Sequence, residues 1–413
     1  MKKALRDMTP QMKLNVLALT CYALAIGFSD SLYSNYFKDA YNVTALQRGL
    51  IETPRELPGM LCLFMTAGLS FLGETKNIII AQILMFAGII VLGLFTPPLG
   101  VMFIFLFINS IGMHMSMPLQ DSVGMSLAEP DRVGQRMGQF NSFKTAAQMV
   151  AAVVVFIGFR IGFLSFKTRL KVPFLISAVL FAVSTLLYWK LHVATGSKSG
   201  IKRKVKFVFK KEYKYFYILA ITRALEKQIT LVYGPWVLIE LLNRGTDTTA
   251  VLAIISFGIG IFFLPAIGRG IDKFGAGKML IVQSVSFICI YTALAFTSIR
   301  ILGCDGAPSV FLVILACFLY MADKTVYQMG MVRTVYLKSI ALDSADVPPT
   351  LSTGLSIDHV VTLFAAYFFG LIWDSWGPQY VFFITAGVSC ITCITSLLIC
   401  RQSRHALDTA DNS

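Results

Sequence analysis

Charged residues are scarce in this chain of 413 residues. Asp, Glu, Lys and Arg make up 14% of the sequence and hydrophobic residues 56%, whereas a soluble protein of this length carries roughly 25% charged residues. The mean hydropathy is +0.70. This composition excludes an ordinary soluble domain and indicates a polytopic membrane protein.

Motifs of several other protein classes are also missing. The sequence contains no Walker-type phosphate loop, which argues against transport driven by ATP. It shows no nucleophile–base pair and no metal-ligand constellation, so we expect neither an enzyme nor a cofactor nor a bound metal. Cys390 and Cys393 form a C-x-x-C pattern inside an apolar run. There they are expected to be packing residues.

The N-terminus lacks a signal-peptide cleavage site. Residues 1–13 are charged and lead directly into an apolar run without the small residues that a signal peptidase needs. We therefore expect a retained first helix.

One long polar run interrupts the interior of the chain, between residues 190 and 214. It contains nine Lys and Arg residues against a single acid, Glu212. Dense basic clusters between apolar spans are retained on the cytoplasmic side of a membrane. A nucleic-acid patch is the alternative, but most of the net charge of +14 lies in loops assigned to the cytoplasm. No nucleic-acid partner is therefore expected.

Apolar runs long enough to cross a bilayer, about 20 residues each, occur twelve times. Spans of this length are helices, because only a helix or a closed barrel satisfies its backbone in lipid. The predicted fold class is an all-α membrane protein. It has residues 1–190 as one six-helix bundle, 191–214 as a cytoplasmic linker, and 215–413 as a second bundle with a short tail. The twelve spans are Leu14–Phe37, Leu46–Leu72, Ile78–Phe95, Val101–Ser122, Gly138–Phe163, Val172–Trp189, Tyr215–Leu241, Ala250–Ile267, Met279–Ile299, Val310–Val335, Leu351–Trp373 and Gln379–Cys400.

The distribution of basic residues predicts the orientation. With both termini in the cytoplasm, about 22 Lys and Arg lie inside and about 7 outside. We expect a multi-pass protein of the inner (plasma) membrane, in contact with the lipid bilayer and monomeric.

Charges inside the spans are unevenly distributed. The third, sixth, eighth, ninth and twelfth spans have none in their interiors, whereas the other spans carry roughly fourteen. Each charge costs about 2.5–3.5 kcal/mol at the bilayer centre, so the charges must face each other or water. Two six-helix repeats, each with a charge-free third and sixth helix, indicate a secondary transporter with a site near the midplane.

The segment GRGIDKFGAGK, from Gly268 to Lys278, follows the eighth span. It resembles the G-x-x-x-D-[RK]-x-G-[RK]-[RK] loop of the major facilitator superfamily, and with twelve spans and a basic middle segment the resemblance covers nearly the whole chain. It implies an inward gate at Gly268, Asp272, Lys273 and Gly275.

Other parts of the sequence follow the family less closely. The first copy of the loop, Gly68 to Lys76, is degraded, and its acid is displaced to Glu74. Residues 52–59 and 233–238 are similar to segments of uncharacterised bacterial members of the family. This similarity does not indicate a substrate. The fourth span lacks the arginine common in proton-coupled members. The fifth lacks the glycine–proline motif of drug antiporters.

In the first half, an acid and a charged pair lie at similar depths. Asp30 is about two turns from the outer end of its span, and Arg55 and Glu56 are about 10 residues from the outer end of theirs. Asp30 can therefore reach Arg55. These residues form either a structural ion pair or a coupling and substrate site, and the two alternatives stay open.

Basic residues and a histidine are candidates for contacts with the solute. Arg223 and Glu226 can pair at i,i+3, which would leave Lys227 available, and Lys144 has no partner on its own helix. These bases could hold an anion; pairing with Asp358 or Asp323 is the structural alternative.

His114 lies among Met113 and Met117, a combination that could bind Cu(I). We expect instead a histidine that lines a cavity.

Two adjacent pairs lie at middle depth in the second half: Asp323–Lys324 and Asp358–His359. Removal from water favours a protonated carboxyl group, and histidine titrates near neutrality. These residues are therefore candidate proton carriers, together with Asp30 and Glu56.

The predicted function is secondary transport of a small polar solute, with an anion as one candidate, by alternating access and with protons as coupling ion. One alternative is a proton-driven multidrug efflux pump, although an aromatic cavity with few charges would suit that function better. The second is a receptor or scaffold with a transporter fold, which would be expected to lose its in-span charges or to gain a signalling domain.

Overall fold

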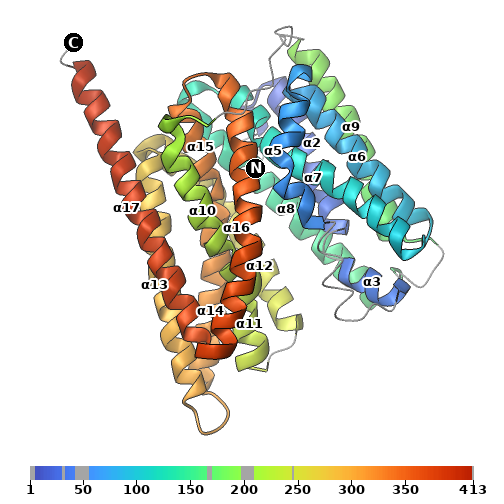
Figure 1. Ribbon diagram of the computed structural model, residues 1–413. Helices are drawn as coiled ribbons and strands as arrows, with labels where there is room; N and C mark the ends of the chain where they lie inside the picture. The colour runs from blue at the N-terminus through green and yellow to red at the C-terminus, as the bar shows by residue number, and fades with distance from the viewer. Residues whose placement is uncertain are drawn as a thin grey trace. The chain divides into compact units, whose positions relative to one another are not determined.

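The computed structural model describes residues 5–29, 33–41, 55–164, 170–196, 209–243 and 246–411 (Figure 1). Within these residues the chain is almost entirely helical and contains no strand. Asp30, one of the candidate residues, lies outside the described residues. The chain divides into two compact units. The first comprises residues 1–130, 139–209 and 342–356, and the second comprises 131–138, 210–341 and 357–413.

The first unit is built from long helices and short helical turns. Residues 55–60 are helical and precede α5. The elements are α2 (Pro10–Ser29), α3 (Tyr33–Tyr41), α5 (Cys62–Gly68), the 3-10 turn η2 (Ser70–Leu72), α6 (Glu74–Leu94), α7 (Leu99–Leu127), the 3-10 turn η3 (Pro130–Arg132), α8 (Val133–Arg160) and α9 (Val172–Thr195). Residues 131–138, which include the first turn of α8, belong to the second unit.

Small residues allow α6 and α7 to pack closely in this unit. A Cβ atom on Gly112 of α7 would collide with the carbonyl oxygen of Ala81 on α6. Such close approach of backbones is typical of helix pairs in membranes. Helix α9 packs against both α2 and α6, so the two charge-free helices α6 and α9 lie beside each other.

The second unit contains the more irregular helices. Its elements are η4 (Lys211–Tyr213), α10 (Lys214–Gln228), the π-helical segment η5 (Ile229–Tyr233), α11 (Gly234–Trp236), the π-helical segment η6 (Val237–Leu241), α12 (Thr246–Phe274), α13 (Ala276–Leu302), α14 (Val310–Tyr327), the 3-10 turn η7 (Gln328–Gly330), α15 (Met331–Ile340), α16 (Val347–Trp376) from residue 357 onward, and α17 (Pro378–Asp411). The 3-10 turn η8 (Ser344–Asp346) and the start of α16, up to residue 356, belong to the first unit. Helices α13 and α17, also charge-free in their spans, pack along each other.

Ten helical segments among the described residues are long and apolar enough to cross a membrane, and each corresponds to one of the twelve expected spans. The second and seventh spans are not among the ten. The second begins outside the described residues. The seventh carries Arg223, Glu226 and Lys227 and is divided by π-helical segments.

In the seventh span the helix continues through Gly234 and Pro235, with π-helical turns on both sides. Two details differ from the sequence-based expectations. The tenth span is interrupted at the 3-10 turn that ends at Gly330. Helix α12 continues to Phe274 because the first turn-forming glycine is Gly275, whose φ is 84°.

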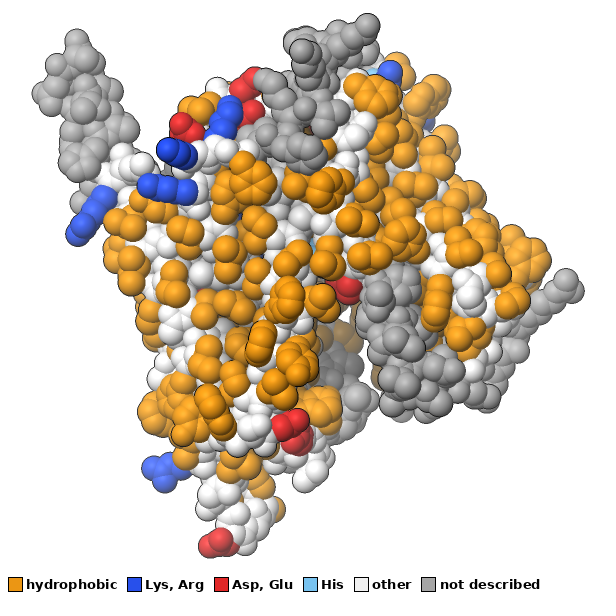
Figure 2. All heavy atoms as spheres, viewed as in Figure 1, with side chains coloured by type: hydrophobic (Ala, Val, Ile, Leu, Met, Phe, Trp, Pro, Cys, Tyr) orange, Lys and Arg blue, Asp and Glu red, His pale blue; other side chains and the backbone are white. Residues whose placement is uncertain are grey.

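Large apolar side chains face outward on the charge-free helices. Val179 on α9 is 62% exposed and Phe296 on α13 is 58% exposed. Hydrophobic side chains dominate the visible face in Figure 2, and charged side chains gather toward the helix ends. This pattern suits helices that face lipid.

Candidate functional site

An ion pair joins α10 to α16 in the second unit. The Lys227 ammonium donates to Asp358 Oδ2 over 2.7 Å, and Asp358 is 5% exposed. The structural alternative of a Lys227–Asp358 pair is therefore confirmed. Removing one partner of a buried ion pair is typically destabilising.

Glu226, the residue before Lys227, has different partners. Its Oε1 accepts hydrogen bonds from the hydroxyls of Ser389 at 2.8 Å and Thr392 at 3.3 Å, both on α17. The Arg223–Glu226 pair that the i,i+3 spacing allows does not form a salt bridge within 4.0 Å among the described residues, although Arg223 lies near enough to interact electrostatically with Glu226. The Ser389 and Thr392 hydroxyls bind the Glu226 carboxyl group because they reach it from an adjacent helix. Side chains spaced i,i+3 must instead bend toward each other along one helix.

Asp323 on α14 is fully buried and accepts only hydroxyl hydrogen bonds among the described residues. Thr230 and Tyr291 both donate to its Oδ1 over 3.1 Å. Its Oδ2 is buried without a hydrogen-bond partner. No cation contacts this carboxyl group in the described part of the chain, which sets it apart from Asp358.

The next residue, Lys324, points elsewhere. Its ammonium donates to the backbone carbonyl of Thr230 at 3.4 Å and lies 5.1 Å from the centre of the Tyr320 ring. Asp323 and Lys324 therefore both contact the π-helical segment η5, one through the Thr230 side chain and one through its backbone. π-Helical turns occur frequently at functional sites.

Arg223 packs against the interrupted tenth span. Its guanidinium lies 4.2 Å from the centre of the Tyr327 ring and donates two long hydrogen bonds, of 3.4 Å, to the Tyr327 carbonyl. A side chain on Gly330 would occupy the place of this guanidinium. The glycine in the 3-10 turn thus makes room for the arginine.

In the first unit, Lys144 on α8 finds a neutral partner. Its ammonium donates to Gln120 Oε1 on α7 at 3.1 Å and lies 5.9 Å from the centre of the Tyr22 ring. Three helices of the first unit therefore surround this cation, which fits a site lined by polar and aromatic groups.

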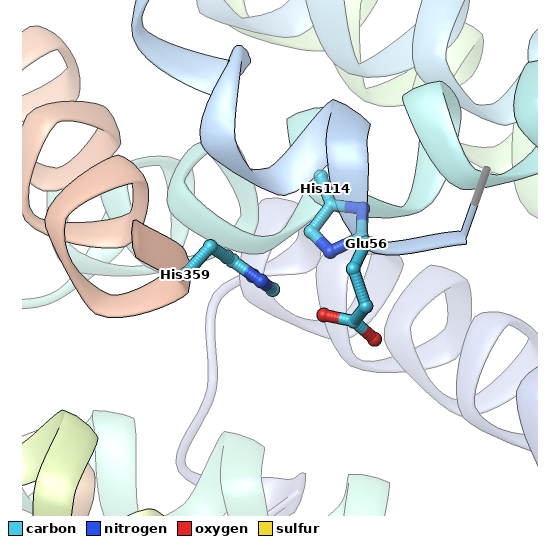
Figure 3. Close-up of side chains that lie close together, drawn as sticks. All are labelled: Glu56, His114 and His359. Atoms are coloured by element: carbon cyan, nitrogen blue, oxygen red, sulfur yellow. The ribbon is translucent and has the colours of Figure 1, made fainter. Parts of the chain in front are cut away.

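His114 and Glu56 lie close together in the first unit (Figure 3), with ligand atoms within 4.8 Å. The Nδ1 of His114 is 2.9 Å from the Ser110 carbonyl on its own helix. This contact assigns the proton to Nδ1 and leaves Nε2 as the acceptor.

Arg55 and His359 complete the set of predicted charged residues. The Arg55 guanidinium lies 5.0 Å from the centre of the Tyr33 ring. The expected contact with Asp30 involves a residue outside the described part of the chain. His359 is buried on α16 in the second unit.

Three of the predicted gate residues, Gly268, Asp272 and Lys273, lie at the end of α12, and Gly275 forms the turn after it. The Asp272 carboxylate accepts hydrogen bonds from the backbone N–H groups of Gly134 and Gln135, both of 2.6 Å. These groups belong to the first turn of α8, so Asp272 caps that helix and meets the positive end of its dipole. Lys273 is exposed beside it.

Close packing supports this contact. A Cβ atom on Gly268 would collide with the carbonyl oxygen of Gly134, and a Cβ atom on Gly138 would lie 2.5 Å from the Leu264 carbonyl oxygen. The glycines therefore bring α12 and the start of α8 together, which places the carboxylate on the N–H groups.

Sequence reasoning missed the uncharged partners of the buried acids. These partners are Tyr291 on α13 and Ser389 and Thr392 on α17. Both helices correspond to spans without charged residues, where no site residues were expected. The available signal was a polar residue on the buried face of an otherwise apolar helix. Ser389 and Thr392, for example, are spaced i,i+3 and share one face.

The sequence matches the family model of the Major Facilitator Superfamily over residues 16–342. A search of curated proteins finds no significant match.

Solved structures share the fold. An outward-facing structure of the transporter FucP is 12% identical, with a TM-score of 0.75, and the match covers 94% of this chain and 98% of that one. A bacterial homologue of the iron transporter ferroportin is 12% identical, with a TM-score of 0.72, covering 94% of this chain and 99% of that one. The proton:xylose symporter XylE is 15% identical, with a TM-score of 0.69 and 93% of each chain covered. This chain belongs to the Major Facilitator Superfamily and is a multi-pass membrane transporter, not an enzyme.

Proposed function

We propose that this protein is a proton-coupled secondary transporter of a small polar solute, with small anions as the first candidates. The observation that carries the proposal is the environment of Asp323. This carboxyl group is fully buried, and its hydrogen-bond partners among the described residues are the hydroxyls of Thr230 and Tyr291.

Hydroxyl partners suit a carboxyl group that gains and loses a proton. A hydroxyl can donate to an ionised carboxylate and can accept from a protonated one, because it carries both a hydrogen and lone pairs. A lysine partner stabilises only the ionised form. We therefore assign a structural role to Asp358, which is paired with Lys227. Asp323 is assigned the role of proton carrier.

The same hydrogen bonds can couple the protonation of Asp323 to a conformational change. Thr230 belongs to η5, the π-helical segment of the seventh span. Protonation of Asp323 removes the negative charge that Thr230 and Tyr291 stabilise, which changes the relative stability of helix arrangements around η5. A ligand shifts a conformational equilibrium only through such a difference in free energy.

The substrate class follows from the cations. Arg223 and Lys144 lie inside the helix bundles, and among the described residues neither makes an ion pair within 4.0 Å. Two structural relatives are described as a fucose:proton symporter and a proton:xylose symporter, which favours symport and keeps neutral sugars as a second substrate class.

The test uses proteoliposomes that contain a pH-sensitive dye. The purified protein is exposed to short carboxylates, inorganic anions and monosaccharides, including fucose and xylose. Proton coupling predicts solute-dependent acidification of the interior. Asp323→Asn should abolish uphill accumulation and solute-driven proton entry but retain exchange of labelled solute between equal pools.

A matched control is Asp305→Asn, which neutralises an exposed acid in the turn after α13 and should leave uphill transport unchanged. Uphill accumulation by Asp323→Asn at the wild-type rate would disprove the assignment of the proton. In that case Glu56, on the other unit, becomes the next residue to neutralise.

Membrane placement is part of the proposal. The excess of basic residues between 190 and 214 supports an orientation with both termini in the cytoplasm of the cell and insertion in the inner (plasma) membrane. A monomer is the expected functional unit, which light scattering of the purified protein would test.

A further inference from the structure

A small polar cavity lies within the second unit, among α10, α13, α15, α17 and the turn η7. Its volume is about 10 Å³, about the room that one water molecule needs. Its polar lining consists of Thr222, Arg223, Glu226, Gln283, Arg333 and Thr392. The size excludes an organic solute or a polyatomic ion, and the polar lining suits water.

One oxygen atom of Glu226 needs a partner in this cavity. Its Oε1 accepts the hydrogen bonds of Ser389 and Thr392, whereas its Oε2 accepts none from the described residues. Glu226 is only 3% exposed, and buried polar atoms are normally hydrogen-bonded. A water molecule in the cavity would supply the missing hydrogen bond.

Two other side chains of the lining have hydrogen-bonding capacity to spare. Gln283 on α13 is 6% exposed, and its amide has no hydrogen-bond partner in the described part of the chain. A guanidinium has five N–H donors, but Arg223 makes only two long hydrogen bonds, both to the Tyr327 carbonyl. Together with Glu226 these groups offer three partners, and buried water molecules typically make about three hydrogen bonds.

Charges of both signs surround the cavity, so a neutral ligand fits it. The charged and titratable groups that face Glu226 are Arg223 on its own helix, Tyr291 on α13, Asp323 on α14 and Arg333 on α15. Helix α17 contributes only hydroxyl groups to Glu226. Arg333 also interacts with Asp358.

A water molecule can serve both charge states of Glu226. It donates to the ionised carboxylate and accepts from the protonated carboxyl group, because it carries both hydrogens and lone pairs. The hydroxyls of Ser389 and Thr392 have the same ability. In its partners, Glu226 therefore resembles Asp323, which is bonded to hydroxyls, and differs from Asp358, which is paired with a lysine.

We propose that one water molecule occupies this cavity, bound by Glu226, Arg223 and Gln283, and that Glu226 is a second proton-binding group of the unit. The proposal rests on the proposed transport function in that it adds a proton site to that of Asp323. Its tests measure water and proton binding without transport, so a failure here leaves the assignment of Asp323 standing. Failure of the Asp323 assignment in proteoliposomes would likewise leave the outcome of these tests unchanged.

The water site is tested on the wild-type protein itself. A crystal structure of the full-length chain, at a resolution that shows ordered water, should contain one density peak in the cavity. The peak should lie within hydrogen-bonding distance of Glu226 Oε2, the Gln283 amide and the Arg223 guanidinium. A cavity without density, in a map that shows water at other buried sites, would overturn the water site.

Proton binding is tested by infrared difference spectroscopy of the purified full-length protein in acidic and alkaline buffer. A protonated carboxyl group has a C=O band that an ionised carboxylate lacks, so each group that binds a proton adds a band to the difference spectrum. Glu226→Gln should remove one band of the wild-type spectrum, and Asp323→Asn should retain that band. A spectrum of Glu226→Gln identical to that of wild type would overturn the proton site.

Gln283→Leu tests the link between the water and the proton. The substitution replaces an amide by an apolar group of similar size, so the water loses a partner while Glu226 is kept. The Glu226 band should move to higher frequency, as expected for a C=O group that loses a hydrogen bond. Gln402→Leu makes the same change at an exposed position on α17 and should leave the band in place.

An unshifted Glu226 band in Gln283→Leu would show that the water does not support this carboxyl group. Because this variant retains Glu226, it keeps the proposal testable even if Glu226→Gln fails to fold.

Discussion

Asp358 and Asp323 are two buried carboxyl groups in the same unit, and their partners differ in kind. Asp358 on α16 receives an ammonium hydrogen bond of 2.7 Å from Lys227. Asp323 on α14 receives two hydroxyl hydrogen bonds of 3.1 Å. Both residues are nearly inaccessible, with 5% and 0% of their surface exposed.

The difference separates acids that hold helices together from acids that can change charge. A buried ion pair is costly to break, because removal of one partner leaves the other charge buried and alone. A carboxyl group held by hydroxyls can be neutral or ionised without losing its partners. In a membrane transporter the second kind is the better candidate for moving protons.

The largest effect on stability is expected from Asp358→Leu. The substitution removes one partner of a buried ion pair and should lower the free energy of unfolding by about 3–5 kcal/mol. The melting temperature of the purified protein in detergent measures the loss.

A double variant sharpens this result. Lys227→Met together with Asp358→Leu removes both charges and should recover most of the lost stability, because a buried pair replaced by apolar residues of similar size is often neutral. If the double variant melts as low as Asp358→Leu, the pair has a role beyond charge compensation.

A smaller loss is expected from Asp272→Asn, where the acid caps a helix and forms no ion pair within the described part of the chain. The amide oxygen can accept from only one of the two N–H groups at the start of α8, so the cost should be about 1–2 kcal/mol. Transport should fall further than this loss explains. Lys273→Gln, at the exposed neighbouring position, should change stability by less than about 0.5 kcal/mol.

Tyr291→Phe should cost about 1 kcal/mol, because one of the two hydrogen bonds to Asp323 is lost and the ring stays packed. The stacked contact with Phe287, whose ring centre lies 5.2 Å away, does not depend on the hydroxyl. Proton-driven uptake should be reduced but not abolished, since Thr230 remains. Complete loss of uptake at full stability would assign the proton pathway to Tyr291 itself.

Asp323→Asn should have the smallest effect on stability, below about 1 kcal/mol, because an amide of the same shape can keep a hydrogen bond from Thr230 or Tyr291 and carries no charge to bury. Its melting temperature should stay near that of wild type. A drop comparable to that of Asp358→Leu would remove the distinction between the two acids.

The partners of the charged side chains were the least predictable part of the site. Arg223 and Glu226 are spaced for an i,i+3 contact, yet each contacts another helix: Arg223 meets Tyr327 and Glu226 meets Ser389. Spacing along one helix states which side chains share a face. It does not state which neighbouring helix lies against that face, and a well-placed partner there competes successfully.

The amino-acid sequence by itself determined the family, the helical class, ten of the described membrane-spanning segments and the presence of charges within the bundles. Hydropathy and charge are read residue by residue, and the bilayer imposes a length that the chain must match. Tertiary structure alone decided that Lys227 pairs with Asp358, that Asp323 is bonded to hydroxyls, and that Arg223 and Gln283 line one cavity. These contacts depend on the rotation and depth of one helix relative to another, which small residues at the helix contacts set and local patterns do not record.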